Sequence, residues 1–395
     1  MEHILIQLTQ KRAQWFYTLV QCFYWLTNGF MYSFATLYLQ DLGFSNSKIG
    51  IFLGCAYGAA ACLQPALASF ISAKGLQIRT SMRTMYSFIA AVALVVLFFP
   101  MPQLLQAGLL VMIFSIQSAA IPCVNTLVKT LEQSGLPVNF GRARGLSCIT
   151  YAIATVIMGQ ITLVIMPKWI PAFYIGSALC MVVLMSVCNV PHVRFEEATA
   201  AKKEKGTGLF KNRKFVQFLM GAGCFYLGLV LLEGFMLQIM QNVKGTSADM
   251  SLALSIGSIA ELLALFFYLR LRKWFGYKKM LLFAGWAWVV RYVIVMLAAS
   301  PMMIFASQLM HFCTFAFYTP ASIDFMSEVL PAKDFLKGQA LLGSICSIGS
   351  VFATFLGGIL LDVLGVSATI GCIIGVAAVG AICFTLAVSS KSKEV

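Results

Sequence analysis

Residues 85–128 read MYSFIAAVALVVLFFPMPQLLQAGLLVMIFSIQSAAIPCVNTLV, and none of these side chains is charged. A helix that crosses a bilayer needs roughly 20 apolar residues, so a stretch of this length holds two spans, which we place at 82–99 and 102–126. An unpaired backbone N–H or C=O group is too costly inside lipid, which makes a helix the expected structure of each span. This stretch indicates an α-helical membrane protein.

The rest of the chain has the same character. Hydrophobic residues make up 60% of the 395 residues, charged residues make up only 11%, and the mean hydropathy is +0.87. A soluble domain of this size would carry about a quarter charged residues. The 12 cysteines are scattered through the apolar runs without a CxxC pair, so neither a metal site nor a cofactor is expected.

Apolar runs of spanning length recur along the whole sequence. We predict an all-α membrane protein with twelve transmembrane helices in two six-helix bundles. The bundles are residues 1–190 and 215–395, joined by the polar cytoplasmic linker 191–214. Two six-span halves with a charged link are typical of the major facilitator fold. The predicted spans are 15–39, 47–72, 82–99, 102–126, 142–166, 170–190, 215–241, 247–271, 278–299, 301–327, 337–361 and 366–389.

Basic residues predict the orientation of these spans. With the amino terminus in the cytoplasm, nearly all of the 28 Lys and Arg residues fall in cytoplasmic segments. The exceptions are Lys48, Lys168 and Lys244 on the outer side and Arg291 inside a span. This bias predicts a multi-pass protein of the cell (inner or cytoplasmic) membrane with both termini cytoplasmic. Topology and contact with anionic membrane lipids account for the net charge of +14, so no nucleic-acid partner is expected, and we expect a monomer.

Four ionisable residues lie near the middle of predicted spans: Glu233, Glu261, Arg291 and His311. Ionisable groups at this depth are expensive and usually functional, although an internal ion-pair network that only joins helices is the plainer alternative. Histidine exchanges a proton near neutral pH. Burial raises the pKa of a carboxyl group and a nearby guanidinium lowers it. The four residues are therefore candidates for proton coupling.

A second run, Asn139–Arg144, precedes the fifth span and is followed by Cys148 and Tyr151. By position alone, its two arginines are flanking cytoplasmic charges and Tyr151 is a bundle aromatic. The run Phe140-Gly141-Arg142-Ala143-Arg144, with Cys148 and an aromatic residue at 151, resembles the start of the fifth span in the lactose permease family of oligosaccharide–proton symporters. Further similar positions are Gln64-Pro65, Glu233, Glu261-Leu262-Leu263, Arg291, His311 and the aromatic first span from Phe16 to Tyr38.

The resemblance implies a role for each matching residue. Arg144 would hydrogen-bond sugar hydroxyls, and Tyr151 would replace the family's Trp as the stacking face for a pyranose ring. Glu261 and His311 would bind the sugar and connect to the coupling site, while Arg291 would tune the proton-carrying acid. With Asn125, these residues are expected to line a cavity between the two halves.

Three positions depart from the family pattern, and they change what the resemblance implies about the substrate and about proton coupling. Asn125 replaces the acid that partners the fifth-span Arg, Gln308 replaces a tenth-span Lys, and Thr314 replaces the proton-carrying acid of that span. Galactoside specificity is therefore not implied. If protons are coupled, Glu261 with His311 is the remaining pair; otherwise a uniporter or another coupling ion is expected.

These observations predict a secondary active transporter of a small polar organic solute, a sugar or glycoside, with proton coupling possible, working by alternating access. The alternatives are an exporter of drug-like or amphipathic compounds, for which the 20 Met and 32 Phe would suit the pocket, and a nucleoside transporter. A non-transporting membrane enzyme or receptor is the third alternative. No phosphate loop, zinc spacing or nucleophile elbow appears in the sequence, so enzymatic activity is not expected.

Overall fold

The computed structural model describes residues 6–190 and 209–389, and nearly all of them are helical. The chain divides into two compact units, which we describe one at a time. The first comprises Met1–Phe44 and Cys55–Lys202, and the second comprises Ser45–Gly54 and Lys203–Val395. Residues 191–208 of the predicted linker lie outside the described residues.

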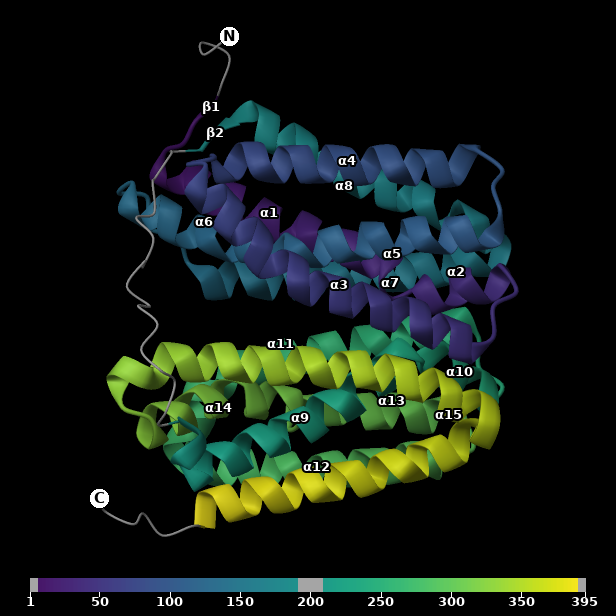
Figure 1. Cartoon of the computed structure of the whole chain (residues 1–395), viewed down its shortest axis with the longest axis vertical. Coiled ribbons are helices and arrows are strands. Elements are labelled where there is room, and N and C mark those ends of the chain that lie inside the picture. The colour runs from purple at the N-terminus through teal and green to yellow at the C-terminus, as the bar shows by residue number, and fades with distance from the viewer. Residues whose placement is uncertain (1–5, 191–208, 390–395) are drawn as a thin grey trace. The chain divides into compact units, whose positions relative to one another are not determined.

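The first unit consists of long helices that run side by side (Figure 1). Within it, α1 packs on α7 and α8, and α4 packs on α5 and α8. Its helices are α1 (Gln10–Met31), α2 (Ala35–Asp41), α3 (Asn46–Ala73), α4 (Ile78–Phe98), α5 (Gln103–Ala119), α6 (Ile121–Gln133), α7 (Phe140–Val164), the 3-10 turn η2 (Pro167–Trp169) and α8 (Ile170–Val187).

One short feature of the first unit is not helical. Strands β1 (Ile6–Gln7) and β2 (Cys188–Asn189) form a two-residue parallel pair, with Ile6 opposite Cys188. This strand pair joins the residues before α1 to the residues after α8. The all-helical prediction did not include it.

The second unit is also a helical bundle. Helix α9 packs against α15, and α12 packs against α14 and α15. Its elements are η3 (Leu209–Lys211), α9 (Arg213–Gly234), α10 (Met236–Asn242), α11 (Ser247–Phe275), α12 (Tyr277–Met296), α13 (Pro301–Leu309), η4 (Met310–Phe312), α14 (Phe315–Val329) and α15 (Ala332–Ser389).

The described residues contain nine helical stretches that are long and apolar enough to cross a membrane. The last of them, Leu341–Ser389, covers the predicted eleventh and twelfth spans. Gly365 separates the two spans with a φ of 74°, a left-handed value that glycine adopts without steric cost. The predicted first and tenth spans correspond to α1 with α2 and to α13 with α14. Every predicted span therefore has a helical counterpart.

Four of the predicted spans are interrupted where the sequence predicted continuous helices. The first is interrupted between Met31 and Ala35, the fourth at Ala120, the seventh at Phe235, and the tenth at residues 310–314. The tenth-span break is a 3-10 turn followed by Thr314, whose φ of −99° and ψ of −92° are not helical. A 3-10 turn within a helix often marks a functional hinge.

Each unit has its own core. In the first unit, buried side chains of α1, α4, α6 and α8 pack together, among them Tyr17, Tyr24 and Tyr86. In the second unit the core is aromatic: Phe225 lies 4.2 Å from Tyr318 between ring centroids, and Phe218 lies 5.0 Å from Phe325. Aromatic pairs at such distances stabilise a bundle beyond their buried area.

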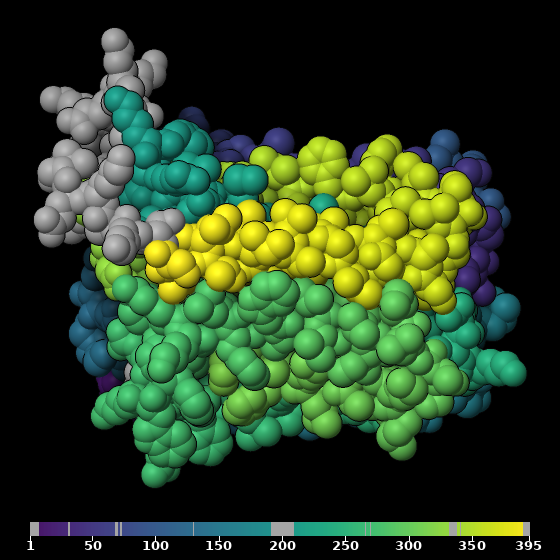
Figure 2. Space-filling view, turned by 90° about the horizontal axis from the view of Figure 1, so that it is seen from below, coloured from purple at the N-terminus to yellow at the C-terminus, as the bar shows by residue number. Residues whose placement is uncertain are grey.

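The outer face of the second unit is apolar. Figure 2 shows the last part of α15 lying along this surface, next to other helices of the unit. Its side chains Val379, Ile382 and Leu386 are about half exposed. Because lipid tails are the solvent in which such a face is stable, the exposed apolar residues fit a membrane protein rather than a soluble one.

The first turns of α3 belong to the second unit. The carboxylate of Asp362 accepts hydrogen bonds from the backbone N–H of Ser47 at 2.7 Å and from the Asn46 amide at 2.9 Å. A Cβ atom on Gly50 would lie 2.3 Å from the carbonyl oxygen of Thr354, so only glycine permits this approach. Asp362 satisfies donors that the first turn of a helix leaves unpaired.

Candidate functional site

The first group of candidate residues lies where α7 begins. The side chain of Asn139 accepts a hydrogen bond from the backbone N–H of Arg142 at 2.8 Å, which makes Asn139 the N-cap of α7. Gln14 of α1 accepts from the backbone N–H of Asn139 at 2.6 Å. The run that attracted attention in the sequence therefore has a local structural role, because it starts α7 and attaches this helix to α1.

Arg144 lies in the second turn of α7 and is half-buried. Its guanidinium carbon is 4.1 Å from the centroid of the Trp25 ring on α1. Its Nη1 donates to Ser147 Oγ at 3.3 Å and to Cys148 Sγ at 3.2 Å, on its own helix. The aromatic face of Trp25 thus holds the guanidinium, a contact that sequence reasoning missed although the first span was noted as aromatic.

Tyr151 lies two turns further along α7, also beside α1. Its hydroxyl is 2.8 Å from Ser33 Oγ, and its ring meets Trp25 edge-on at 6.3 Å between centroids. A Cβ atom on Gly29 would lie 3.4 Å from the Tyr151 ring, so the ring packs closely against α1. The structure therefore brings Arg144 and Tyr151 together around Trp25.

Asn125 is placed differently. It lies on α6, and its side chain is exposed. Arg144 packs on Trp25 of α1 and donates to Ser147 and Cys148 of α7. The cluster around Trp25 is therefore built from α1 and α7, and Asn125 belongs to a different helix of the first unit.

The second group lies inside the second unit and centres on Arg291 of α12. The Arg291 side chain has no exposed surface. Its Nη2 donates to Gln308 Oε1 of α13 at 2.7 Å, and its Nη1 is 2.9 Å from His311 Nδ1 in the break after α13. Because a guanidinium can only donate, Nδ1 of His311 accepts and the ring proton of the neutral histidine lies on Nε2.

Nε2 of His311 faces a carboxylate. It lies 3.8 Å from Oε1 of Glu233, in the last turn of α9. Glu233, His311, Arg291 and Gln308 therefore form a continuous polar chain, which we call the Glu233–Gln308 chain. Four elements supply it: α9, η4, α12 and α13. An isolated charge at such a depth would be very unfavourable, and the chain pairs each charge with a polar partner.

Gln308 holds its place because of a glycine on the neighbouring helix α11. A Cβ atom on Gly257 would lie 2.9 Å from Oε1 of Gln308, the atom that accepts from Arg291. The sequence marked Gln308 only as a departure from a family lysine. In the structure it is a direct partner of the buried arginine.

Glu261 of α11 is half-buried. It interacts electrostatically with Glu233 and with Tyr226 of α9. The contacts of His311 are to Glu233 and Arg291. Glu233 is thus a carboxylate beside His311, and the predicted pairing of Glu261 with His311 stays a prediction.

Comparison with known proteins identifies the family. The model of the MFS_1 like family matches residues 14–370. The chain belongs to this family of the major facilitator superfamily. No curated protein sequence matches the chain.

Solved structures of other transporters share the fold. A mutant form of the nucleoside transporter NupG is 14% identical, with a TM-score of 0.80 over 95% of this chain and 99% of that one. The D-xylose-proton symporter is 14% identical, with a TM-score of 0.70 over 96% of each chain. A bacterial homologue of the human lysosomal transporter Spinster is 13% identical, with a TM-score of 0.67 over 96% of this chain and 97% of that one. The predicted major facilitator fold is confirmed.

Membership in the superfamily makes the chain a multi-pass membrane transporter and not an enzyme, as predicted. Its substrate is a small molecule. The described residues contain no group of three or more His, Cys, Asp or Glu side chains that could bind a metal ion.

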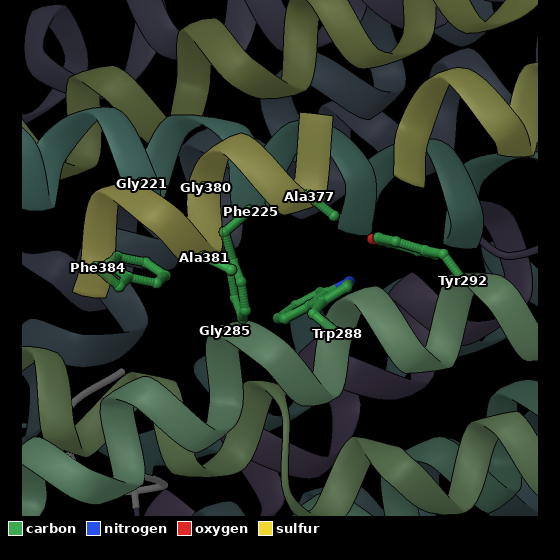
Figure 3. A pocket seen from close by; sticks show the side chains of 9 residues that line it. All are labelled: Gly221, Phe225, Gly285, Trp288, Tyr292, Ala377, Gly380, Ala381 and Phe384. Atoms are coloured by element: carbon green, nitrogen blue, oxygen red, sulfur yellow. The ribbon is translucent and has the colours of Figure 1, made fainter. Parts of the chain in front are cut away.

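The second unit also contains a small cavity. Figure 3 shows this narrow space between α9, α12 and α15, with Phe225, Trp288 and Tyr292 around it and small residues such as Gly380 on the opposite side. Tyr292 follows Arg291 in α12, and its hydroxyl points into this apolar space. The residues that line this cavity include no acidic or basic side chain.

Proposed function

We propose that this major facilitator is a proton-coupled secondary transporter of a small polyhydroxylated solute, a saccharide, glycoside or nucleoside, that works by alternating access. The Glu233–Gln308 chain is the observation that carries the proposal. A completely buried arginine, a histidine and a carboxylate lie in one connected series, and such groups inside a membrane are the usual components of proton relays.

The charge balance of the Glu233–Gln308 chain supports proton coupling. With Glu233 ionised, Arg291 protonated and His311 neutral, the Glu233–Gln308 chain carries no net charge. Adding a proton to Glu233 or His311 leaves one uncompensated positive charge, which is costly in a buried site. Proton binding therefore favours a state in which water or substrate reaches the chain, and that difference between states is what alternating access requires.

The substrate class follows from donor and acceptor chemistry. Arg144, with its fork of N–H donors, lies among aromatic rings in the first unit, and Glu261 supplies acceptors in the second. Hydroxyl-rich rings match such groups because each hydroxyl both donates and accepts. The fold is shared with a nucleoside transporter and a D-xylose-proton symporter, whose substrates both contain a sugar ring. That Asn125, Arg144, Tyr151, Glu261 and His311 contact one bound solute remains part of this proposal.

We also propose the membrane location, the orientation and the oligomeric state of the protein. The distribution of basic residues supports a cell (cytoplasmic) membrane location with both termini and residues 191–214 on the cytoplasmic side. We expect a monomer surrounded by lipid. Membrane-impermeant labelling of a cysteine introduced at Lys273 tests the orientation, because reaction from the outside would contradict it.

Uptake into proteoliposomes tests the function. Purified protein is reconstituted and given radiolabelled D-xylose, lactose or uridine, with and without an inward proton gradient. We expect saturable uptake of at least one probe, accumulation above the external concentration when the gradient is present, and loss of accumulation with a protonophore. Saturable uptake that ignores the gradient would refute proton coupling. Uptake confined to amphipathic cations would favour the exporter alternative.

A further inference from the structure

The small cavity between α9, α12 and α15 is a part of the second unit that the transport proposal does not use. All nine residues that line it are buried, so it lies inside the helix packing (Figure 3). Its lining consists of glycines, alanines and four aromatic rings. Only two of these side chains carry a polar atom: Trp288 has its indole Nε1, and Tyr292 has its hydroxyl.

The indole nitrogen of Trp288 and the hydroxyl of Tyr292 face the same space (Figure 3). The two residues lie about one turn apart on α12, and their ring centroids are 6.2 Å apart. The two groups are near enough to interact electrostatically, but they lack the geometry of a direct hydrogen bond. Both polar atoms are buried, and neither has a hydrogen-bond partner among the described residues.

Gly228 of α9 gives the Tyr292 hydroxyl its place beside the cavity. A Cβ atom on Gly228 would lie 2.5 Å from the hydroxyl oxygen and 3.0 Å from Cζ of the ring. Any other residue at this position would push the hydroxyl away from α9. The backbone of α9 therefore fixes where the hydroxyl lies and limits how it can turn to find a partner.

Two polar groups without partners beside one space are the usual setting of an internal water molecule. A buried N–H or O–H group that loses its hydrogen bonds to water on folding is unfavourable, and the lipid around a spanning helix cannot replace them. A water molecule restores them where the space admits it and offers at least two polar partners. This cavity has about the size of one water molecule, and Trp288 and Tyr292 supply the two partners.

The chemistry of the two groups determines how such a water molecule binds. An indole N–H can only donate, whereas a phenol hydroxyl both donates and accepts. We propose that the cavity between α9, α12 and α15 binds one water molecule, which accepts a hydrogen bond from the Trp288 indole and donates one to the Tyr292 hydroxyl. This water site is independent of the transport function proposed above.

Tyr318 provides a matched control in the same aromatic core. Its hydroxyl is also buried and without a hydrogen-bond partner in the part of the chain that the structure describes, but Tyr318 does not line the cavity. Removing a hydroxyl that has no partner relieves an unfavourable burial, whereas removing one that holds a water molecule breaks a hydrogen bond. The changes Tyr292→Phe and Tyr318→Phe should therefore affect stability in opposite directions.

Thermal unfolding in detergent is the first test. We expect the unfolding temperature to fall by about 2 °C or more in Tyr292→Phe and to stay level or rise in Tyr318→Phe. In a Trp288→Phe background, Tyr292→Phe should lower it by less than half as much, because the water molecule has already lost one partner. An unfolding temperature of Tyr292→Phe that equals or exceeds that of the wild type would overturn the proposal.

The second test looks for the water molecule itself in a crystallographic or cryo-EM map fine enough to show ordered water. In the wild type we expect one round density peak at about 2.7–3.2 Å from both Trp288 Nε1 and the Tyr292 oxygen. The peak should be missing in Tyr292→Phe and present in Tyr318→Phe. A map of the wild type without the peak would overturn the proposal, as would elongated density from a lipid or detergent chain in the cavity.

Discussion

The two units hold their key arginines in different ways. Arg144 in the first unit is half-buried and rests on the face of Trp25, with weak hydrogen bonds to its own helix. Arg291 in the second unit is completely buried and donates to Gln308 and His311, beside the carboxylate of Glu233. The first arrangement places the face of the guanidinium on an aromatic ring at a half-buried position, whereas the second uses the N–H donors for partners in a fully buried site. The comparison suggests that the first unit recognises the solute and the second responds to protons.

The difference in burial predicts the largest contrast in stability. Arg291→Leu removes the donor that serves Gln308 and His311, and it leaves both buried acceptors without a partner, so it should cost about 1–3 kcal/mol for each acceptor. Arg144→Leu should cost about 1 kcal/mol or less, since the guanidinium there is partly exposed. Thermal unfolding of the two variants in detergent measures the contrast. A further variant, Glu233→Gln with Arg291→Gln, should recover part of the loss; equal unfolding temperatures for Arg291→Leu and Arg144→Leu would break the comparison.

The second contrast concerns coupling. Glu233→Gln removes the carboxylate next to His311, so gradient-driven accumulation should disappear and the internal-to-external ratio should fall to about one. Glu261→Gln should weaken solute binding, seen as a higher KM, and keep some accumulation. The sequence favoured Glu261 with His311 for the proton, so the opposite pattern, with accumulation lost only in Glu261→Gln, would restore that assignment. Counterflow, which needs no gradient, should persist in Glu233→Gln as a control for folding.

A smaller effect is expected at the glycine beneath Gln308. In Gly257→Ala, the new methyl group would meet Oε1 of Gln308 and push it from Arg291, at a cost of about 1–3 kcal/mol, typical of overpacking. The matched control is Gly375→Ala in α15, because a Cβ atom there would meet nothing within 4 Å. Thermal unfolding of both variants should show a loss for Gly257→Ala alone. A neutral Gly257→Ala would mean that Gln308 moves freely and does not hold Arg291.

The smallest effect compares the asparagines that start one helix in each unit. Asn139 caps α7 by accepting from Arg142 N–H at 2.8 Å, and Asn212 caps α9 by accepting from Phe215 N–H at 3.2 Å. Asn212 also donates to the carbonyl of Val329 at 3.0 Å. Each change to alanine should cost about 1 kcal/mol, the usual value of an N-cap, with Asn212→Ala the larger because it loses two bonds. In thermal unfolding, a larger loss in Asn139→Ala would reverse the order.

The ionisable residues inside the apolar spans could be found from the sequence, because each of them stands out in an otherwise uncharged run. Arg291 and His311 are the exceptions inside uncharged runs, so their depth follows from counting residues along a helix. Helix bends are harder to predict. The breaks at Phe235 and at residues 310–314 lie in apolar stretches without a strong signal, and they decide where Glu233 and His311 point.

The sequence by itself determined that this protein is a helical membrane transporter: the apolar runs, the distribution of basic residues and the buried ionisable groups all follow from the cost of placing charge in lipid. Only the tertiary structure decided which groups meet. Position along a span gives a residue's depth, whereas its neighbours depend on how each helix is rotated and bent. For that reason only the structure placed Glu233 beside His311, made Gln308 a partner of Arg291, and set Trp25 against Arg144.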